Sequence, residues 1–463
     1  MKIKLTLTLL TLFVVNSFAN VTLPAVFGSN MVLQQKSKVK IWGWAKSGET
    51  VKITNNWNDQ TAEYKTTPMG TWEIELQTPV FGGPYELIIS GYNTIKLENI
   101  LIGEVWLVSG QSNMEWSAGS GIDSAQTEIE KANFPEIRFF SVSHATAAFP
   151  QQNLNGKWDV CTPASMKYFS AIGYFFAKKL HHDLSVPVGI INSSWGGTPA
   201  EAWTPESAIK ADPTLFKDAI GLKEVPWGPV KTASIYNAMI APMIGFKLKG
   251  FLWYQGEANV MNAANYDKLL NTMIASWRNA WQEELPFYFV QIAPYKYGQP
   301  EEGVALRNAQ RLAETTPNTA MVCISDIGNI DDIHPKNKKD VGNRLANVAL
   351  KNLYNIKLGT VQGPKLLTYE TKKGNIVLYY DSPDLNCDEK CKDNFEVADL
   401  SGNFYKANIR IKSNTITLSS TKVNNPIFAR FEWNNIAEAS LKNSIGLPAS
   451  AFITDNWWSF KNK

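Results

Sequence analysis

Histidine is scarce in this sequence, which has 463 residues but only four histidines. A reaction that uses an imidazole base therefore has few candidates for it. Cysteine is equally scarce, with four residues, so a disulfide scaffold is excluded. Neither sign of charge dominates, because 45 Lys and Arg face 42 Asp and Glu. A protein that binds nucleic acid needs a dense basic face, so nucleic acid is not expected as a partner.

Long apolar runs are missing after the first 19 residues, so no later segment is predicted to span a membrane. The N-terminus carries Lys2 and Lys4, then an apolar stretch from Leu5 to Val15, then the small residues Ser17 and Ala19 at −3 and −1 of the expected cleavage point. This order is typical of a secretory signal. We therefore expect residues 1–19 to be removed and the mature chain to be exported, to the periplasm or the medium.

Aromatic rings and apolar residues are plentiful, with 16 Trp, 16 Tyr and 44% hydrophobic residues. The length predicts about three domains. Short alternating runs in residues 20–99 are typical of a small β-sandwich-like domain. Continuous apolar runs between helical periods in residues 100–354 predict a doubly wound parallel α/β sheet. Residues 355–463 return to short β runs, so the expected fold is α/β with N-terminal and C-terminal β-rich regions.

The four cysteines predict at most one disulfide, between residues close together in the sequence. Cys387 and Cys391 are four residues apart in a polar segment, a spacing that suits a local disulfide. A zinc site would need further ligands nearby and is not expected there. Cys161 and Cys323 are far apart in sequence and are expected to be separate buried thiols.

Polar turns follow several apolar runs of the predicted sheet, at the edge where ligands bind in such sheets. The first turn holds Ser112, in the motif Gly110-Gln-Ser-Asn113 directly after a buried strand. It is not the Gly-x-Ser-x-Gly nucleophile elbow, because Met114 replaces the second glycine. Ser112 is thus a candidate nucleophile that needs an activating base from elsewhere in the chain.

The best candidate for that base is His334, which follows two carboxylates, Asp331 and Asp332. A carboxylate that holds an imidazole in the right tautomer completes a catalytic triad, and either aspartate is close enough in sequence. The other histidines fit less well, since two end a charged helical segment and His144 lies in a small polar loop.

Two further turns offer donors for an oxyanion. Gly196 and Gly197 are paired glycines, which let a backbone N–H approach a developing negative charge. The turn after the strand that starts at Gly250 adds a side-chain amide, from Gln255 or Asn259.

Together these motifs resemble those of the SGNH-type serine hydrolases, and more narrowly those of the sialate O-acetylesterase family. The matching segments are Gly110-Gln-Ser-Asn113, Trp195-Gly-Gly-Thr198, Trp253-Tyr-Gln-Gly-Glu257 and Asp332-Ile-His-Pro-Lys336. The resemblance implies a flavodoxin-like fold, Ser112 as nucleophile and His334 as base. It also implies an oxyanion hole from the Ser112 N–H, a glycine N–H at Gly196 or Gly197, and the amide of Gln255, with Asn259 in reserve.

The acid of the triad is less well defined by the resemblance. The broad superfamily uses Asp-x-x-His, which favours Asp331, whereas Asp332 belongs to the narrower motif and is the alternative acid. Trp116, Trp195 and Glu257 border the motif turns and are predicted to contact substrate.

The expected activity is an exported esterase that removes O-acetyl groups from carbohydrate through an acetyl-serine intermediate, with O-acetylated sialic acid as the first substrate. Acetylated xylan or another plant polysaccharide is the alternative substrate. A non-catalytic carbohydrate-binding protein and a lipase or thioesterase are less favoured. No metal or organic cofactor is expected, and the sequence predicts no particular oligomeric state.

Overall fold

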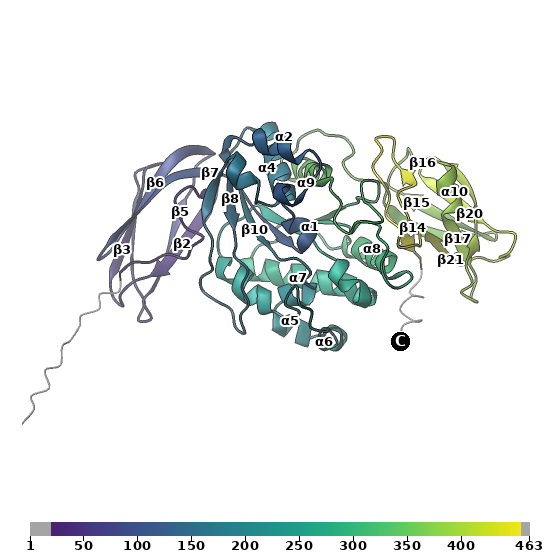
Figure 1. Ribbon diagram of the computed structural model, residues 1–463, viewed down its shortest axis with the longest axis horizontal. Helices are drawn as coiled ribbons and strands as arrows, with labels where there is room; N and C mark the ends of the chain where they lie inside the picture. Colours follow the sequence, from purple (N-terminus) through teal and green to yellow (C-terminus); the bar gives the residue numbers. More distant parts are fainter. Residues whose placement is uncertain (1–19, 455–463) are drawn as a thin grey trace, which may run out of the picture.

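The computed structural model describes residues 20–454, so the predicted signal segment, residues 1–19, lies outside the described residues. Figure 1 shows three parts in a row, with a β-rich part at each end of a central part that contains the long helices. Within the described stretch, no helix is long and apolar enough to cross a membrane.

The N-terminal part is built from short strands with alternating burial, as the sequence predicts. The strands are β1 (Val32–Gln34), β2 (Lys38–Trp44), β3 (Thr50–Asn55), β4 (Thr61–Lys65), β5 (Thr71–Gln77) and β6 (Gly82–Ser90). Strand β2 pairs with β5, and β3 pairs with β4 and β6, all antiparallel. Alternate side chains of β2 and β5, such as Val39 and Leu76, are buried, which explains their period of two.

A single strand of 17 residues, β7 (Thr94–Gly110), joins the N-terminal and central parts. Its first half pairs antiparallel with β6, and its second half lies between two parallel strands of the central sheet. Every residue from Ile100 to Gly110 is buried, whereas of the six residues before Ile100 only Leu97 is buried. The boundary predicted after residue 99 therefore marks a change in burial within one continuous strand.

The central sheet has the strand order β13-β12-β11-β7-β10-β8-β9. Its other strands are β8 (Phe134–Ser141), β9 (Trp158–Cys161), β10 (Val188–Ser194), β11 (Gly250–Tyr254), β12 (Phe287–Val290) and β13 (Thr319–Val322). All neighbours are parallel except β9, which runs antiparallel to β8. A mainly parallel sheet places the carboxyl ends of its strands at one edge.

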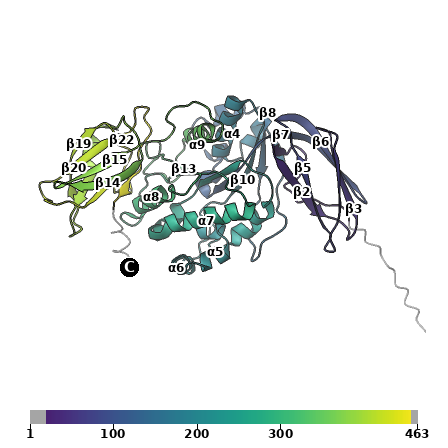
Figure 2. The same cartoon turned by 180° about the vertical axis from the view of Figure 1, so that it is seen from behind.

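Helices lie on both sides of this sheet, and Figures 1 and 2 show the two layers. On one side are α4 (Ala171–Leu184) and α9 (Lys338–Leu353); on the other are α7 (Tyr266–Trp281) and α8 (Glu302–Ala313). Large rings fill the space between helices and sheet. Trp106 packs on Phe176 of α4 with ring centroids 5.0 Å apart, and Phe251 packs on Trp277 of α7 at 5.4 Å.

Shorter helices connect these elements. They are α1 (Ser112–Glu115), α2 (Ala125–Glu130), α3 (Pro163–Met166), α5 (Glu206–Lys210) and α6 (Pro213–Ile220). The structure is thus a mixed α/β protein with a mainly parallel central sheet, as predicted.

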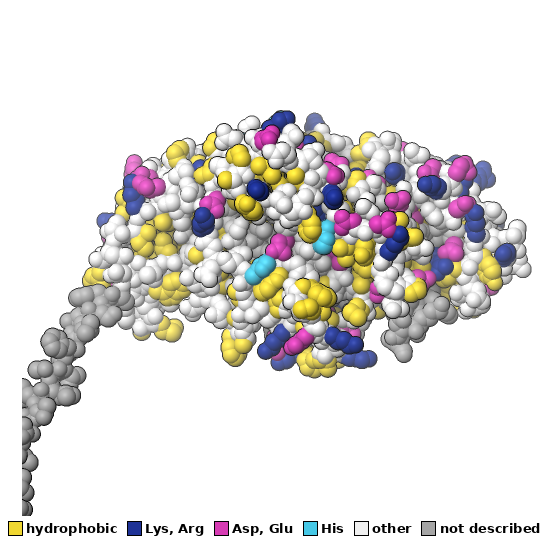
Figure 3. Space-filling model, viewed as in Figure 1, with side chains coloured by type: hydrophobic (Ala, Val, Ile, Leu, Met, Phe, Trp, Pro, Cys, Tyr) yellow, Lys and Arg dark blue, Asp and Glu magenta, His cyan; other side chains and the backbone are white. Residues whose placement is uncertain are grey.

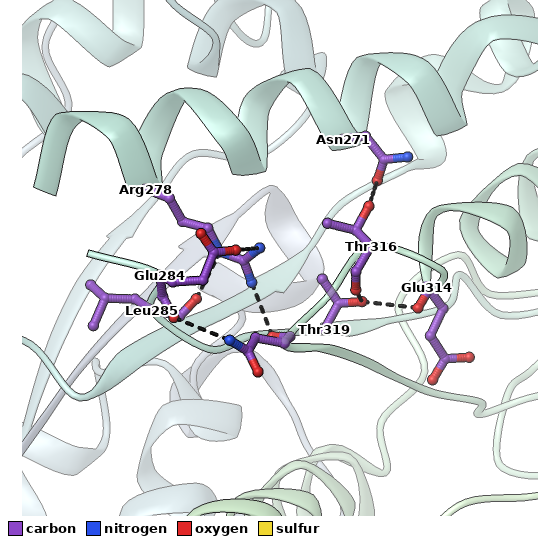
Figure 4. A network of polar contacts seen from close by, with 8 residues as sticks. Asn271, Arg278, Glu284, Leu285, Glu314, Thr316 and Thr319 are labelled. Carbon is purple, nitrogen blue, oxygen red and sulfur yellow. Dashed lines mark hydrogen bonds and ion pairs between the residues drawn. The ribbon is translucent and has the colours of Figure 1, made fainter. Parts of the chain in front are cut away.

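Polar contacts fix the end of α7 to the loops beside the outer strands of the sheet (Figure 4). The Arg278 guanidinium donates to the Leu285 carbonyl at 2.8 Å and to the Glu284 carboxylate at 2.7 Å. The Thr316 hydroxyl donates to Asn271 Oδ1 at 2.7 Å. Because Arg278 is buried, its bonds to Leu285 and Glu284 compensate the cost of taking its charge out of water.

The C-terminal part has its own hydrophobic core and consists of short antiparallel strands with one short helix. The elements are β14 (Leu366–Lys372), β15 (Asn375–Tyr380), β16 (Asn386–Cys387), α10 (Glu389–Asp393), β17 (Phe395–Ala398), β18 (Tyr405–Lys406), β19 (Asn408–Lys412), β20 (Thr415–Ser419), β21 (Phe428–Phe431), β22 (Leu441–Lys442) and β23 (Phe452–Ile453). Cys387 and Cys391 form the expected local disulfide. Cys161 and Cys323 are free thiols, and only Cys161 is fully buried.

Candidate active site

The candidate nucleophile, Ser112, lies where β7 ends in the middle of the sheet. Gly110 has a φ of +134°, and a Cβ atom there would lie 2.1 Å from the Tyr254 carbonyl oxygen of neighbouring β11. Only glycine fits this close approach. The chain then turns, and α1 begins at Ser112, which is half-buried at the carboxyl edge of the sheet.

The structure brings Ser112 and His334 together from distant parts of the sequence. His334 lies in the loop between β13 and α9, and its Nε2 is 2.9 Å from the Ser112 Oγ. Burial, and then the positive charge of Lys338, lower the pKa of His334, against the opposing effect of Asp332. A lowered pKa favours the neutral imidazole, which is the form that accepts a proton from a hydroxyl.

The two candidate acids differ in what they contact. Asp332 Oδ1 accepts a hydrogen bond from the backbone N–H of His334 at 2.9 Å. Asp331, the residue favoured by superfamily spacing, forms an ion pair with Lys296, and its side chain is 67% exposed. Within residues 20–454, neither carboxylate has a hydrogen bond to the imidazole ring. The geometry therefore runs against the preference for Asp331, because its carboxylate is held by Lys296 instead.

A buried polar cluster lies behind the nucleophile. Asn113 Nδ2 donates to Glu257 Oε1 at 2.6 Å and to the Ile333 carbonyl at 2.9 Å, while Lys338 Nζ donates to Asn113 Oδ1 at 2.6 Å. Burial raises the pKa of Glu257 to about 7 and lowers that of Lys338 to about 7. The cluster joins the turn that carries Ser112 to the loop that carries His334.

Glu257, predicted to contact substrate, belongs to this buried cluster. The residue is only 8% exposed, and its Oε1 is already bound to Asn113. In the ligand-free structure the Glu257 carboxylate is therefore covered, and its contact with substrate stays a prediction.

The predicted amide donors are also committed elsewhere. Gln255 is fully buried; its Nε2 donates to the Thr198 carbonyl at 3.1 Å and to Asn259 Oδ1 at 2.7 Å, and its Oε1 accepts from the Tyr266 hydroxyl at 2.7 Å. Asn259 Nδ2 donates to Glu201 at 2.8 Å. Without a bound ligand, the side-chain N–H groups of Gln255 and Asn259 thus hold neighbouring segments together, and the oxyanion role of these two residues stays a prediction.

A third amide, which the sequence analysis did not consider, lies beside the nucleophile. Gln111 Oε1 accepts hydrogen bonds from the backbone N–H groups of Gly256 at 3.3 Å and Ala258 at 3.2 Å. Across the described part of the chain, no hydrogen bond uses Gln111 Nε2 or the backbone N–H of Ser112. These donors remain available to a ligand.

The paired glycines lie against the nucleophile. A Cβ at Gly196 would be 3.2 Å from the Ser112 Cβ. The Gly196 N–H is not free, because it donates to Glu115 Oε2 at 2.7 Å. Gly197 has a left-handed φ of +71°, and a Cβ there would be 2.2 Å from Trp227 Cδ1. Glycine at both positions therefore permits close approach by Ser112 and by Trp227.

The predicted substrate-contacting tryptophans each stack on a histidine. The Trp116 ring lies 4.2 Å from the His334 ring at an interplanar angle of 18°, and the Trp195 ring lies 4.3 Å from the His144 ring at 2°. Trp253, in contrast, is fully buried in the sheet. Trp116 and Trp195 are half-buried, so each ring packs on a histidine while part of its side chain stays accessible.

Glu115 and His144 are site residues that the sequence analysis missed. His144 Nε2 is 2.8 Å from Glu115 Oε1, and this hydrogen bond raises the pKa of His144. Figure 3 shows histidine and acidic side chains exposed near one another over the central part. Glu115 follows Ser112 within the same motif, which is a local signal, whereas nothing in the sequence near His144 indicates its place here.

Among residues 20–454, no group of three or more His, Cys, Asp or Glu side chains is arranged to hold a metal ion. The arrangement around Ser112 is that of a hydroxyl next to a neutral base.

Residues 102–351 match the family model described as a carbohydrate esterase, sialic acid-specific acetylesterase. The chain belongs to this family. The membership confirms the resemblance noted in the sequence and identifies the chain as a carboxylic ester hydrolase.

Relatives of this esterase match over most of their length. The sialate O-acetylesterase of Rattus norvegicus is 31% identical, with 72% of this chain and 74% of the relative covered, and that of Homo sapiens is 30% identical, with 73% and 72% covered. A solved structure of a carbohydrate acetylesterase from Xanthomonas citri has 32% identity and a TM-score of 0.85, and it covers 94% of this chain and 100% of its own. The agreement therefore extends across both β-rich parts.

Proposed function

We propose that this esterase removes O-acetyl groups from carbohydrate through an acetyl-serine intermediate. The observation that supports the mechanism is the 2.9 Å contact between Ser112 Oγ and His334 Nε2 at the carboxyl edge of the sheet. We also propose the doubly wound form of the α/β fold, since β7 is central and the chain adds strands first on one side of it and then on the other.

The reaction proceeds in two halves. His334 takes the proton of Ser112 as the oxygen attacks the acetyl carbonyl, and the sugar hydroxyl leaves with that proton. Water, deprotonated by His334, then attacks the acetyl-serine. The bond from the acetyl carbon to Ser112 Oγ breaks, His334 returns the proton to Oγ, and acetate is released. The lowered pKa of His334 keeps the base unprotonated in the resting enzyme.

The oxyanion of each tetrahedral intermediate accepts hydrogen bonds from the backbone N–H of Ser112 and from the Gln111 amide. The Gly196 N–H becomes a third donor when its bond to Glu115 Oε2 is exchanged. Gln111 takes the place predicted for Gln255, because its Oε1 is fixed by two backbone donors while its Nε2 has no partner within the described residues. Preorganised donors of this kind are worth several kcal/mol in the transition state.

Asp332 acts as the carboxylate of the site. Its hydrogen bond to the His334 backbone N–H holds the loop, and its negative charge favours the imidazolium that forms during attack. Asp331 has no such contact, and its partner is Lys296.

The substrate class follows from the relatives. The similarity to sialate O-acetylesterases makes O-acetylated sialic acid the first candidate substrate. Acetylated xylan is the second candidate, since the Xanthomonas citri structure is that of a carbohydrate acetylesterase. Export after cleavage at Ala19 remains part of the proposal.

Acetate release tests the proposal directly. The wild-type enzyme and Ser112→Ala are compared on O-acetylated sialic acid, acetylated xylan oligomers and 4-nitrophenyl acetate at matched concentrations. We expect Ser112→Ala to lose at least about 10³-fold in kcat on each ester that the wild type hydrolyses. Equal rates for the two proteins would refute the serine mechanism.

A further inference from the structure

One carboxylate beside the nucleophile, Glu115, takes no part in the proposed proton transfers. Glu115 lies on α1, three residues after Ser112, and its two oxygens have different partners. Oε2 accepts from the Gly196 N–H at 2.7 Å, and Oε1 is 2.8 Å from His144 Nε2. Its side chain is 35% exposed, so it is accessible to a ligand that enters next to Ser112.

A large exposed ring lies over the second glycine of the same pair, Gly197. Trp227 is 65% exposed, and its Cδ1 lies over Gly197, where a Cβ would approach to 2.2 Å. The next residue, Gly228, packs against Gly196, since a Cβ there would be 2.9 Å from the Gly196 carbonyl oxygen. The loop with Trp227 is therefore held on the turn that faces Ser112, while the ring itself remains largely in water.

Trp227 and Glu115 match the two kinds of surface that a sugar presents, its apolar C–H face and its hydroxyl groups. An aromatic ring offers an apolar face, which suits the C–H face of a pyranose, and a carboxylate accepts hydrogen bonds from hydroxyl groups. Ligand sites for polar molecules combine such an apolar wall with a few placed polar groups. An acetyl group is too small to need either, so both suit the part of the substrate that leaves.

We propose that Glu115 and Trp227 form the subsite that binds the sugar leaving group. This inference rests on the proposed function and adds a specificity-determining pair to it. When the sugar binds, one of its hydroxyl groups replaces the Gly196 N–H as the hydrogen-bond donor to Glu115. The Gly196 N–H is then released to the oxyanion, so a hydroxylated leaving group itself prepares the donor that the reaction needs. His144 holds the other oxygen of Glu115 during this exchange.

The test compares a substrate that has sugar hydroxyls with one that has none. For each variant, kcat/KM is measured on 4-nitrophenyl acetate and on the acetylated sugar that the wild type hydrolyses fastest, and the ratio of sugar to plain ester is taken. We expect Trp227→Ala to lower this ratio at least about tenfold, through a higher KM for the sugar, and Trp227→Phe to retain it within about threefold.

Glu115→Gln lowers the same ratio at least about tenfold, by two effects. It weakens the bond to the sugar hydroxyl, and it removes a negative charge beside the developing oxyanion, which raises the rate on the plain ester. Phe81→Ala is the matched control, because Phe81 is also an exposed ring, 48% accessible, but lies in the N-terminal β part. Its ratio stays at the wild-type value.

The outcomes separate the subsite from the proposed function. An unchanged ratio in either Trp227→Ala or Glu115→Gln overturns the subsite, while loss of activity in Ser112→Ala would leave the serine mechanism intact. Full activity of Ser112→Ala would overturn the mechanism itself. Thermal unfolding of each variant, with Trp227→Phe as the conservative partner, distinguishes a binding loss from a folding loss.

Discussion

The assignment of the acid can be tested by replacing Asp331 and Asp332 separately with asparagine. Asp331 forms an exposed ion pair with Lys296, and such pairs contribute about 0 to 1 kcal/mol. Asp331→Asn is therefore expected to lower kcat/KM by no more than about fivefold. Asp332 accepts a hydrogen bond from the His334 N–H at 2.9 Å, and hydrogen bonds to charged groups are worth about 1.5–3 kcal/mol.

That range corresponds to a loss of about 13- to 160-fold for Asp332→Asn, toward the lower end because asparagine keeps a side-chain oxygen as an acceptor. The assay is kcat/KM on 4-nitrophenyl acetate, with the free energy of unfolding measured in urea for both variants. A larger loss for Asp331→Asn than for Asp332→Asn would refute the assignment. Small and equal losses would show that Ser112 and His334 act without a carboxylate.

Three further perturbations test the buried groups and the disulfide. Lys338→Met removes a charge that lowers the pKa of His334, so that pKa rises and the acid limb of the kcat/KM profile moves to higher pH; an unmoved limb would contradict this. Gln255→Leu leaves its buried partners unsatisfied and should lower the free energy of unfolding by about 2–4 kcal/mol in urea titrations. Unchanged stability with a large loss of kcat would instead restore its predicted oxyanion role. Reduction of the Cys387–Cys391 disulfide should cost the C-terminal part about 2 kcal/mol, measured by thermal unfolding with and without dithiothreitol, and no shift would rule this out.

The sequence carried enough information to bring Ser112 and His334 into one site. Both follow buried strands, and parallel strands end at one edge of a sheet, so residues that follow different strands converge there. The continuous burial from Ile100 to Gly110 is visible as an apolar run, which is why the central sheet was predictable. It was not predictable that one strand, β7, joins the N-terminal and central parts. No local pattern distinguishes one continuous strand from two strands that follow each other in sequence.

The side-chain donors were harder to predict because sequence shows that an amide is near a turn but not where it points. Gln111 directly precedes Ser112, and Gln255 directly follows strand β11. The Gln255 amide is hydrogen-bonded to the Tyr266 hydroxyl and the Thr198 carbonyl, which lie 11 and 57 residues away in the sequence. Gln111 Nε2 has no partner among residues 20–454, because the backbone donors bind only its oxygen. The difference arises from long-range packing, which local motifs do not encode.

The scarcity of histidine illustrates the same limit. With four histidines, elimination identified His334 as the base candidate, since the alternatives lay in a helix end and a loop. The same reasoning discarded His144, yet its ring lies flat on Trp195 and its Nε2 contacts the carboxylate that covers the Gly196 N–H. Elimination tests one role at a time, and His144 fails only as a base for Ser112. His144 instead contacts Glu115 and holds that carboxylate in place. His334 cannot do this, because its ring is already bound to Ser112.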